Sequence, residues 1–246
     1  MTQLLEVAGV DKDFGGVRAA DGLSLSLGEG EMLCLIGPNG CGKTTLFNLI
    51  TGALKADAGE LRFDGRSLRG REPHEIARLG ILRKFQVPGI YAELSVAENL
   101  TVALVGSGAG SGEEGPGRLD ELLALARLAG RRDLPAGSLA HGEKQWLEIA
   151  MVLARRPRLL LLDEPTNGMT AAETAATVAL IRDLHRRFGC AVLVIEHDMG
   201  FVRDLACPVA LMLRGRIVRR GGYETLQADP LVREAYLGSI DLEALG

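Results

Sequence analysis

The residues best suited to chemistry begin with one glycine-rich stretch over residues 37–45. Its members are Gly37, Pro38, Asn39, Gly40, Cys41, Gly42, Lys43, Thr44 and Thr45. An apolar run over residues 32–36 precedes the stretch, and residues 46–50 follow it with helical spacing. Glycines let successive backbone N–H groups curl around phosphate oxygens, and a helix N-terminus adds the positive end of its dipole. In this context the pattern predicts a phosphate-binding loop and not an ordinary glycine-rich turn.

Two side chains of this loop match the needs of a nucleoside triphosphate. Lys43 offers a point charge for the β- and γ-phosphates, and Thr44 offers a hydroxyl ligand for Mg²⁺. We therefore predict that the protein binds a nucleotide together with Mg²⁺.

A second reactive element follows the unbroken apolar run at residues 159–162, which predicts a buried parallel strand. Asp163 and Glu164 stand at the carboxyl end of that run. Asp163 can reach Mg²⁺ through water, and Glu164 is placed to take a proton from an attacking water. Positioning and charge neutralisation supply most of the rate of phosphoryl transfer, so these residues predict nucleotide hydrolysis.

The composition bounds the class of protein. The chain has 246 residues, and 47% of them are hydrophobic, which is enough for a substantial core. Its net charge of -4 argues against a nucleic-acid-binding surface. No apolar run approaches the roughly 18 residues of a membrane span. The first residues lack the basic and apolar regions of a signal peptide. The four cysteines lack metal-ligand spacing. We expect a cytosolic protein whose cysteines are reduced.

Alternating strand and helix patterns predict an α/β fold with a largely parallel sheet. Expected strands lie at 3–8, 23–27, 60–65, 81–86, 159–162 and 191–195, with a hairpin over 209–213 and 216–219. Expected helices lie at 73–79, 96–105, 119–128, 171–188 and 199–206, with two short helices over 224–237. We expect residues 11–16 to join the first two strands as a loop.

We read the chain as one domain over residues 1–246, with a core built from 1–86 and 156–246. Residues 87–155 form an inserted helical subdomain in this interpretation, because helical periodicity dominates them. The glycine-rich stretch 106–117 inside it is a linker by composition.

A third motif decides which nucleotide-dependent protein the sequence resembles. It consists of Ser138, Leu139, Ala140, His141, Gly142 and Glu143, just before a predicted helix and the acidic strand. With the phosphate loop, this order resembles the ATP-binding-cassette (ABC) ATPases, whose signature reads Leu-Ser-Gly-Gly-Gln. Phe14 lies where that family stacks an aromatic ring on adenine. Gln86 lies at the position of the Q-loop glutamine, and His197 at that of the switch histidine.

The resemblance covers nearly the whole chain and implies a P-loop NTPase core, mostly parallel but with an antiparallel β part, and an inserted helical subdomain. It implies a head-to-tail dimer with a second ABC ATPase subunit that sandwiches two ATP molecules, each between one phosphate loop and the partner's signature. Gln86 would sense Mg²⁺ and the attacking water, and His197 would hold the γ-phosphate and organise Glu164. The further partners implied are two transmembrane permease subunits and, indirectly, a solute-binding protein. The ATPase would lie on the cytoplasmic face of the inner membrane.

Two residues depart from the family pattern. Ala140 replaces the signature serine and removes a hydroxyl that would contact the partner's γ-phosphate, while the backbone N–H groups at His141 and Gly142 remain. Thr170 stands where many relatives carry an aspartate in the D-loop, the segment after the catalytic acid. We expect the first change to weaken one ATP site, and the second to affect communication between sites.

Smaller details favour one branch of the family. Residues 14–16, 84–86, 196–199 and 236–238 resemble ATPases of branched-chain amino acid and urea importers, and 141–149 with 168–170 resemble the urea-importer ATPase more closely. Permease docking is implied near residues 86–98. The apolar residues expected to contact the permease, or simply to pack the subdomain, are Val87, Ile90, Tyr91 and Leu94.

Three alternatives stay open at the level of sequence. The chain could serve another ABC importer or exporter. It could be a soluble ABC protein acting on DNA or ribosomes, although such proteins usually carry two cassettes, coiled coils or basic extensions. It could also be an inactive regulatory subunit, which Ala140 favours and the intact catalytic residues oppose.

Overall fold

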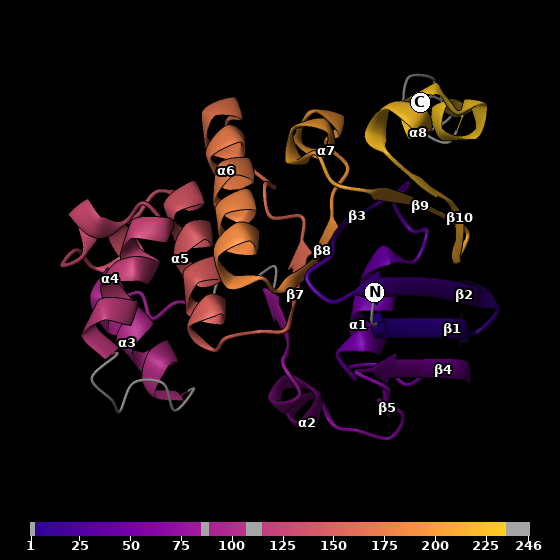
Figure 1. Ribbon diagram of the computed structural model, residues 1–246, viewed down its shortest axis with the longest axis horizontal. Helices are drawn as coiled ribbons and strands as arrows, with labels where there is room; N and C mark the ends of the chain where they lie inside the picture. Colours follow the sequence, from indigo (N-terminus) through magenta and orange to yellow (C-terminus); the bar gives the residue numbers. More distant parts are fainter. Residues whose placement is uncertain (1–2, 85–88, 107–114, 235–246) are drawn as a thin grey trace.

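The computed structural model describes residues 3–84, 89–106 and 115–234 (Figure 1). The strands are β1 (Gln3–Phe14), β2 (Val17–Gly28), β3 (Met32–Ile36), β4 (Ala58–Phe63), β5 (Arg66–Ser67), β6 (Ile81–Lys84), β7 (Leu159–Asp163), β8 (Ala191–Ile195), β9 (Val209–Leu213) and β10 (Arg216–Gly221). The α-helices are α1 (Lys43–Ile50), α2 (Pro73–Arg78), α3 (Val96–Gly106), α4 (Gly115–Leu125), α5 (His141–Ala154), α6 (Ala171–Phe188), α7 (Met199–Leu205) and α8 (Tyr223–Ala228). Two 3₁₀ turns, η1 (Ala129–Arg131) and η2 (Ala136–Ser138), precede α5.

The central sheet has the strand order β10-β9-β3-β8-β7-β6. Strands β9, β3, β8, β7 and β6 pair in parallel, and β10 pairs antiparallel with β9. Every residue of β3, β7 and β8 is buried, which explains their unbroken apolar sequences. The predicted α/β class with a largely parallel sheet is confirmed, and so is the hairpin of β9 and β10. Parallel strands end at one edge, so the loops after β3, β7 and β8 meet there.

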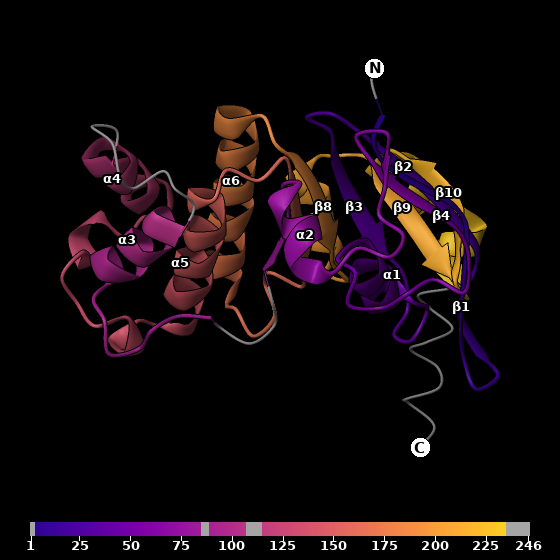
Figure 2. The same cartoon turned by 90° about the horizontal axis from the view of Figure 1, so that it is seen from below.

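A second, antiparallel sheet with the order β2-β1-β4-β5 packs against one side of the molecule (Figures 1 and 2). Helix α1 lies between the two sheets, and its apolar residues, including Leu46, Phe47 and Ile50, join a core shared by both. Burying α1 on several sides fixes the direction in which its N-terminus points.

The first two strands are longer than their apolar patterns indicate. We expected a loop over 11–16, but β1 continues to Phe14 and β2 begins at Val17, leaving only Gly15 and Gly16 as the turn. The hairpin extends beyond the core, so most side chains near its tip are exposed or half-buried. Register shifts between Val7 and Asp13 also break the alternation of apolar residues on which strand prediction depends.

Helices α3, α4 and α5 gather at the end of the molecule opposite the antiparallel sheet, and α6 stands between them and the central sheet (Figures 1 and 2). One apolar cluster runs through all of these layers, from Leu100 and Leu122 through Leu147 and Ile181 to Leu160 of the sheet. The helical part therefore shares its core with the sheet. The proposed boundaries of the subdomain at 87 and 155 stay a prediction.

Some predicted boundaries shift or fall outside the described residues. Helix α4 starts before residue 119 and ends at Leu125, because Arg127 adopts a positive φ of 59° that a helix cannot continue. Two short helical segments were expected over 224–237, and the structure has α8 followed by helical residues 230–234. Phe85, Gln86 and most of the linker lie outside the described residues. Within the described ranges, no helix is long and apolar enough to cross a membrane.

Two glycines in the region of the antiparallel sheet both have a positive φ, but only one of them has backbone atoms close to where a Cβ would lie. Gly59 has φ +81°, and a Cβ there would lie 2.3 Å from the Gly9 carbonyl oxygen. Gly70 has φ +76° with nothing within 4 Å of such a Cβ. We predict that Gly70→Ala lowers the free energy of unfolding by about 1–2 kcal/mol, the strain of a left-handed residue. Gly59→Ala should cost more, about 3 kcal/mol or above, because backbone must also move. Urea denaturation of both variants measures the difference, and equal losses would contradict the steric explanation.

Candidate active site

The loop over residues 37–42 is shaped by glycines that touch neighbouring backbone. A Cβ at Gly37 would lie 2.2 Å from the Met212 carbonyl oxygen, and one at Gly42 would lie 2.1 Å from the Ala19 carbonyl oxygen. Gly42 is also the N-cap of α1, with φ 108° and no side-chain cap. The first N–H groups of α1 are therefore not capped by a side chain, and an anion can accept hydrogen bonds from them.

Lys43 is the cation inside this loop. Only 7% of the residue is exposed, and its Nζ donates to the carbonyl oxygens of Gly37 at 2.6 Å and Pro38 at 3.0 Å. Thr44 is exposed and Thr45 is half-buried in the same first turn. A charge held against the loop and an open hydroxyl beside it suit a phosphate chain.

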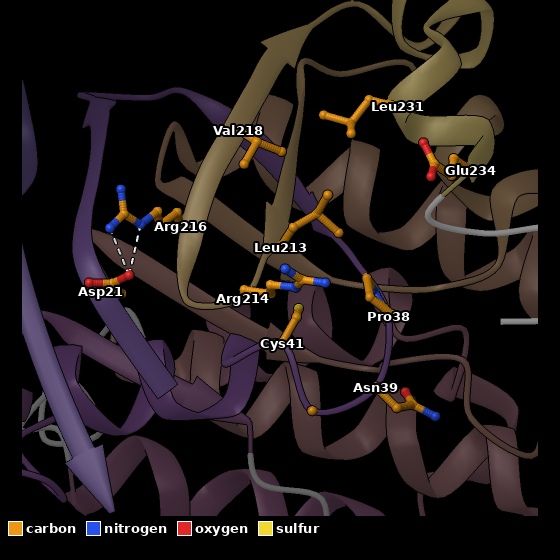
Figure 3. Close-up of a pocket in the computed structure, with 11 residues that line it drawn as sticks. Asp21, Pro38, Asn39, Cys41, Leu213, Arg214, Arg216, Val218, Leu231 and Glu234 are labelled. Carbon is orange, nitrogen blue, oxygen red and sulfur yellow. Dashed lines mark hydrogen bonds and ion pairs between the residues drawn. The ribbon is translucent and has the colours of Figure 1, made fainter. Parts of the chain in front are cut away.

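The other side of the loop is fastened to the β9–β10 hairpin. The Gly215 N–H donates to the Cys41 carbonyl oxygen at 2.9 Å, and the Asp21 N–H donates to the Gly215 carbonyl oxygen at 3.1 Å. Asp21 also accepts from Arg216 at 2.7 Å (Figure 3). The sequence predicted the hairpin but contains no signal that it would support the phosphate loop.

A cavity of about 670 Å³ lies between the loop and this hairpin. Figure 3 shows Arg214 on the hairpin turn beside Cys41 and Pro38. Cys41 itself is 5% exposed, and burial raises the pKa of its thiol. It therefore stays protonated at neutral pH and acts here as a packing residue of the loop.

Asp163 ends β7 and is almost fully buried, with 2% exposure. Its Oδ2 pairs with Arg83 Nη2 at 2.5 Å, and Arg83 Nη1 also donates to Asn48 Oδ1 of α1 at 2.6 Å. The guanidinium lies 5.3 Å from the centre of the Phe47 ring. Sequence reasoning missed Arg83, which joins the acidic strand to the helix that begins at the phosphate loop.

Glu164 follows directly and adopts φ 45°, an uncommon conformation for a residue other than glycine. Its N–H donates to the Ile195 carbonyl oxygen at 3.0 Å, which ties it to the end of β8. Its Oε1 lies 3.8 Å from Nδ1 of His197, whose side chain is 58% exposed. The structure thus brings Glu164 and His197 together at the edge where β3 ends.

Two further residues, Phe14 and Gln86, were predicted to contact ATP or its Mg²⁺ within the same chain. Phe14 stands at the tip of the first hairpin, 47% exposed, with Lys12 Nζ 5.5 Å from its ring centre. An exposed aromatic ring of this kind can stack on a base. Gln86, predicted to sense Mg²⁺, lies outside the described residues.

The signature motif forms the N-terminus of α5. Ser138 ends η2, Leu139 is buried, and Ala140 is the N-cap. Alanine has no side-chain oxygen to cap the helix, and the capping contact comes instead from Glu143, whose Oε2 accepts from the Ala140 N–H at 3.0 Å. Arg131 Nε lies 3.3 Å from the other oxygen of Glu143. Glu143 therefore stabilises the start of the helix.

The signature is also hydrogen-bonded to the D-loop of the same chain. His141 Nε2 lies 3.0 Å from the carbonyl oxygen of Asn167. A Cβ at Gly142 would lie 2.7 Å from Glu173 Oε1, so a larger residue there would displace the Glu173 carboxylate. Thr170 caps α6 and exchanges hydrogen bonds with Glu173. These contacts between α5 and the D-loop were not visible in the sequence.

Comparison with known proteins finds relatives over nearly the whole chain. Residues 20–167 match the family described as ABC transporter. The chain is 36% identical over 249 residues to the high-affinity branched-chain amino acid transport ATP-binding protein BraF of Pseudomonas aeruginosa, a match that covers 96% of this chain and 98% of that protein. The chain belongs to the ABC transporter family. It is an ABC ATPase, the ATP-hydrolysing type of transporter subunit.

Other relatives and structures agree with this membership. The ABC ATPase is 35% identical to the methionine import ATP-binding protein MetN of Rhizobium etli, over 97% of this chain and 67% of that protein. A crystallised ATP-binding cassette of an ABC transporter in its ADP conformation superposes with a TM-score of 0.85 at 30% identity, covering 97% of this chain and 100% of that one. A dimeric cassette bound to ADP and Pi superposes with a TM-score of 0.76 at 26% identity, over 89% and 99%. The predicted ABC ATPase fold is confirmed.

The place of Lys43 leads to a direct binding test. We predict that Lys43→Ala weakens ATP binding by about 100-fold, because the variant loses charge-assisted hydrogen bonds to the phosphates. Titration of a fluorescent ATP analogue measures the affinity. Lys55→Ala, which removes an exposed lysine in the segment after α1, is the matched control and should bind normally. Unchanged affinity in Lys43→Ala would refute the assignment of the phosphate loop.

Proposed function

We propose that this ABC ATPase supplies the energy for an importer of branched-chain amino acids. The observation that carries the proposal is the 36% identity to BraF over nearly the full length of both chains. The LivG protein of Salmonella typhimurium, also a high-affinity branched-chain amino acid transport ATP-binding protein, matches to the same extent. Urea or another amide is the second candidate solute, because residues 141–149 resemble the ATPase of urea importers.

ATP binding in this proposal uses the loop already built by the fold. The N–H groups of residues 40–45 and the ammonium of Lys43 surround the phosphates, and Phe14 stacks on adenine. Thr44 supplies a hydroxyl ligand for Mg²⁺, an ion that keeps much of its water. Asp163, whose Oδ2 pairs with Arg83 at 2.5 Å, would reach the ion through one of those waters. Gln86 is the third proposed ligand. When bound, Mg²⁺ would neutralise charge on the β- and γ-phosphates.

Hydrolysis is assigned to the acid and the histidine that meet at the end of the sheet. Glu164 accepts a proton from the attacking water, and His197 donates a hydrogen bond to the γ-phosphate. The 3.8 Å between Glu164 Oε1 and His197 Nδ1 supports a joint action of the two side chains. Most of the rate would come from their fixed positions rather than from covalent chemistry.

A complete site needs the signature of a second subunit. In the proposed head-to-tail dimer, the N–H groups of His141 and Gly142 reach the γ-phosphate held by the partner's loop. Ala140 offers no hydroxyl there, so the site completed by this signature has one contact fewer. The partner subunit can be a second copy of this chain or an unlike ATPase. In both cases the missing contact weakens the binding of the ATP held by the partner's phosphate loop.

The permease would dock beside the helical part, on the cytoplasmic face of the cell membrane. A cavity of about 480 Å³ there is lined partly by Tyr91, Val102 and Met151.

One wall of this cavity is polar and contains Lys84 and Glu148, whose Nζ and Oε2 lie 3.6 Å apart. Burial lowers the pKa of Lys84 and raises the pKa of Glu148. Among the other predicted contacts, Ile90 packs against the core, Leu94 is half-buried, and Val87 lies outside the described residues.

Replacing the proposed base separates binding from turnover. Glu164→Gln keeps the shape of the side chain but cannot take a proton, so we predict normal ATP binding, a stable ATP-bound dimer and loss of hydrolysis. Size-exclusion chromatography with ATP and a phosphate-release assay measure the two effects. Cells carrying the variant should lose uptake of labelled leucine, while cells carrying Lys55→Ala retain it. Normal hydrolysis would remove Glu164 as the base, and lost uptake of urea alone would favour the second solute.

The signature alanine predicts an effect that depends on the partner. Ala140→Ser restores a hydroxyl toward the γ-phosphate, and one hydrogen bond to a charged group changes a rate by about tenfold or more when it forms in the transition state. We expect faster hydrolysis only when the subunit whose site is completed is present. Measuring turnover with and without that subunit tests this. No change in the complex would mean that the backbone donors suffice.

A further inference from the structure

Glu196 is a buried carboxylate at the end of the central strand β8. It follows Ile195 and immediately precedes His197, and only 1% of the residue is exposed. A carboxylate is rarely buried at this depth unless hydrogen bonds offset the loss of water. Its surroundings therefore need an explanation beyond packing.

The two oxygens of Glu196 face two different loops. Oε1 accepts from the N–H of Thr166 at 3.1 Å and from its hydroxyl at 2.6 Å. Oε2 accepts from the N–H of His197 at 3.1 Å. One side chain thus receives three donors and joins the segment after β7 to the segment after β8.

Both segments carry a residue proposed to act in hydrolysis. Thr166 lies two positions after Glu164 and is 8% exposed, and His197 carries the imidazole. The ring nitrogen Nδ1 lies 3.8 Å from Glu164 Oε1 and 3.9 Å from Glu196 Oε2. The imidazole is therefore flanked by one reactive carboxylate and one buried carboxylate.

Packing alone holds this imidazole weakly, because 58% of its side chain is exposed. Its position depends on the backbone that carries it, and Glu196 anchors that backbone at the His197 N–H. The same carboxylate anchors the loop that follows Glu164. An active-site group needs such support, since small displacements of reacting groups lower the rate strongly.

We propose that Glu196 is a positioning residue for ATP hydrolysis, which sets the distance between Glu164 and His197 by holding their loops together. The proposal rests on the proposed roles of those two residues. It assigns no contact between Glu196 and ATP, so Glu196 should affect the rate of hydrolysis and not the affinity for ATP.

Two substitutions remove different parts of the contact. In Glu196→Gln the amide oxygen can still accept from Thr166, but the amide nitrogen cannot accept from the His197 N–H. Thr166→Val removes the hydroxyl donor and leaves the N–H. Thr51→Val is the matched control, since Thr51 Oγ1 donates to the Phe47 carbonyl oxygen at 2.8 Å at the far end of α1.

We expect Glu196→Gln to lower kcat about tenfold and Thr166→Val to lower it about threefold, effects of the size that a lost hydrogen bond to a charged group produces. KM for ATP should stay within about twofold in both, and Thr51→Val should change neither constant. Unchanged kcat in Glu196→Gln, or KM rising in step with the fall in kcat, would overturn the proposal.

Amide hydrogen exchange keeps this test separate from the proposed function. In Glu196→Gln the His197 amide should exchange faster than in the wild type, while the amides of β3 keep their protection. If the wild-type chain assembled with its partner ATPase subunit binds ATP without hydrolysing it, the proposed function is wrong, and the exchange rate still decides whether Glu196 anchors the loop. Unchanged exchange at His197 would contradict the anchoring role.

Discussion

The structure depends on the parallel alignment of three buried strands, β3, β8 and β7. Backbone hydrogen bonds continue past their ends, from the Glu196 N–H to the Leu35 carbonyl oxygen at 3.3 Å and from the Glu164 N–H to the Ile195 carbonyl oxygen at 3.0 Å. The phosphate loop, the histidine and the acid therefore emerge from one rigid edge. Because successive side chains of these strands fill two different buried faces, a slip of one residue would exchange the side chains packed on each face, so the loops keep their places.

Close approach of neighbouring segments at glycine positions is the second constraint. Gly37 and Gly42 let the phosphate loop lie against the hairpin of β9 and β10 and against β2, and Gly142 lets α5 lie against Glu173. Each glycine carries a loop or helix terminus that is proposed to meet phosphate. The loop and the helix terminus proposed to meet phosphate are thus also places where neighbouring segments pack closely.

The sequence predicted those parts of the site whose functional residues are neighbours along the chain. The phosphate loop and the acidic strand each combine a pattern of residues with the strand that carries them, so both could be predicted with their elements. Contacts between residues that are far apart in the sequence could not be predicted. Arg83 reaches Asp163 across 80 positions, Thr166 reaches Glu196 across 30, and His141 reaches Asn167 across 26. Nothing local distinguishes such a residue from any other polar side chain, because its partner is chosen by strand order and helix packing.

Lys43 shows what the fold contributes before any nucleotide arrives. Its ammonium is already held by two carbonyl oxygens of its own loop, and little of the side chain remains exposed. A free lysine side chain loses about 2 kcal/mol of rotational freedom when it is fixed in one place. Here the side chain is already fixed when the protein folds, so this entropy loss is part of the free energy of folding and not of the free energy of ligand binding. In the proposed ATP site, an arriving phosphate would exchange places with carbonyl oxygens at a preformed cation, so the entropy of the lysine would no longer oppose binding.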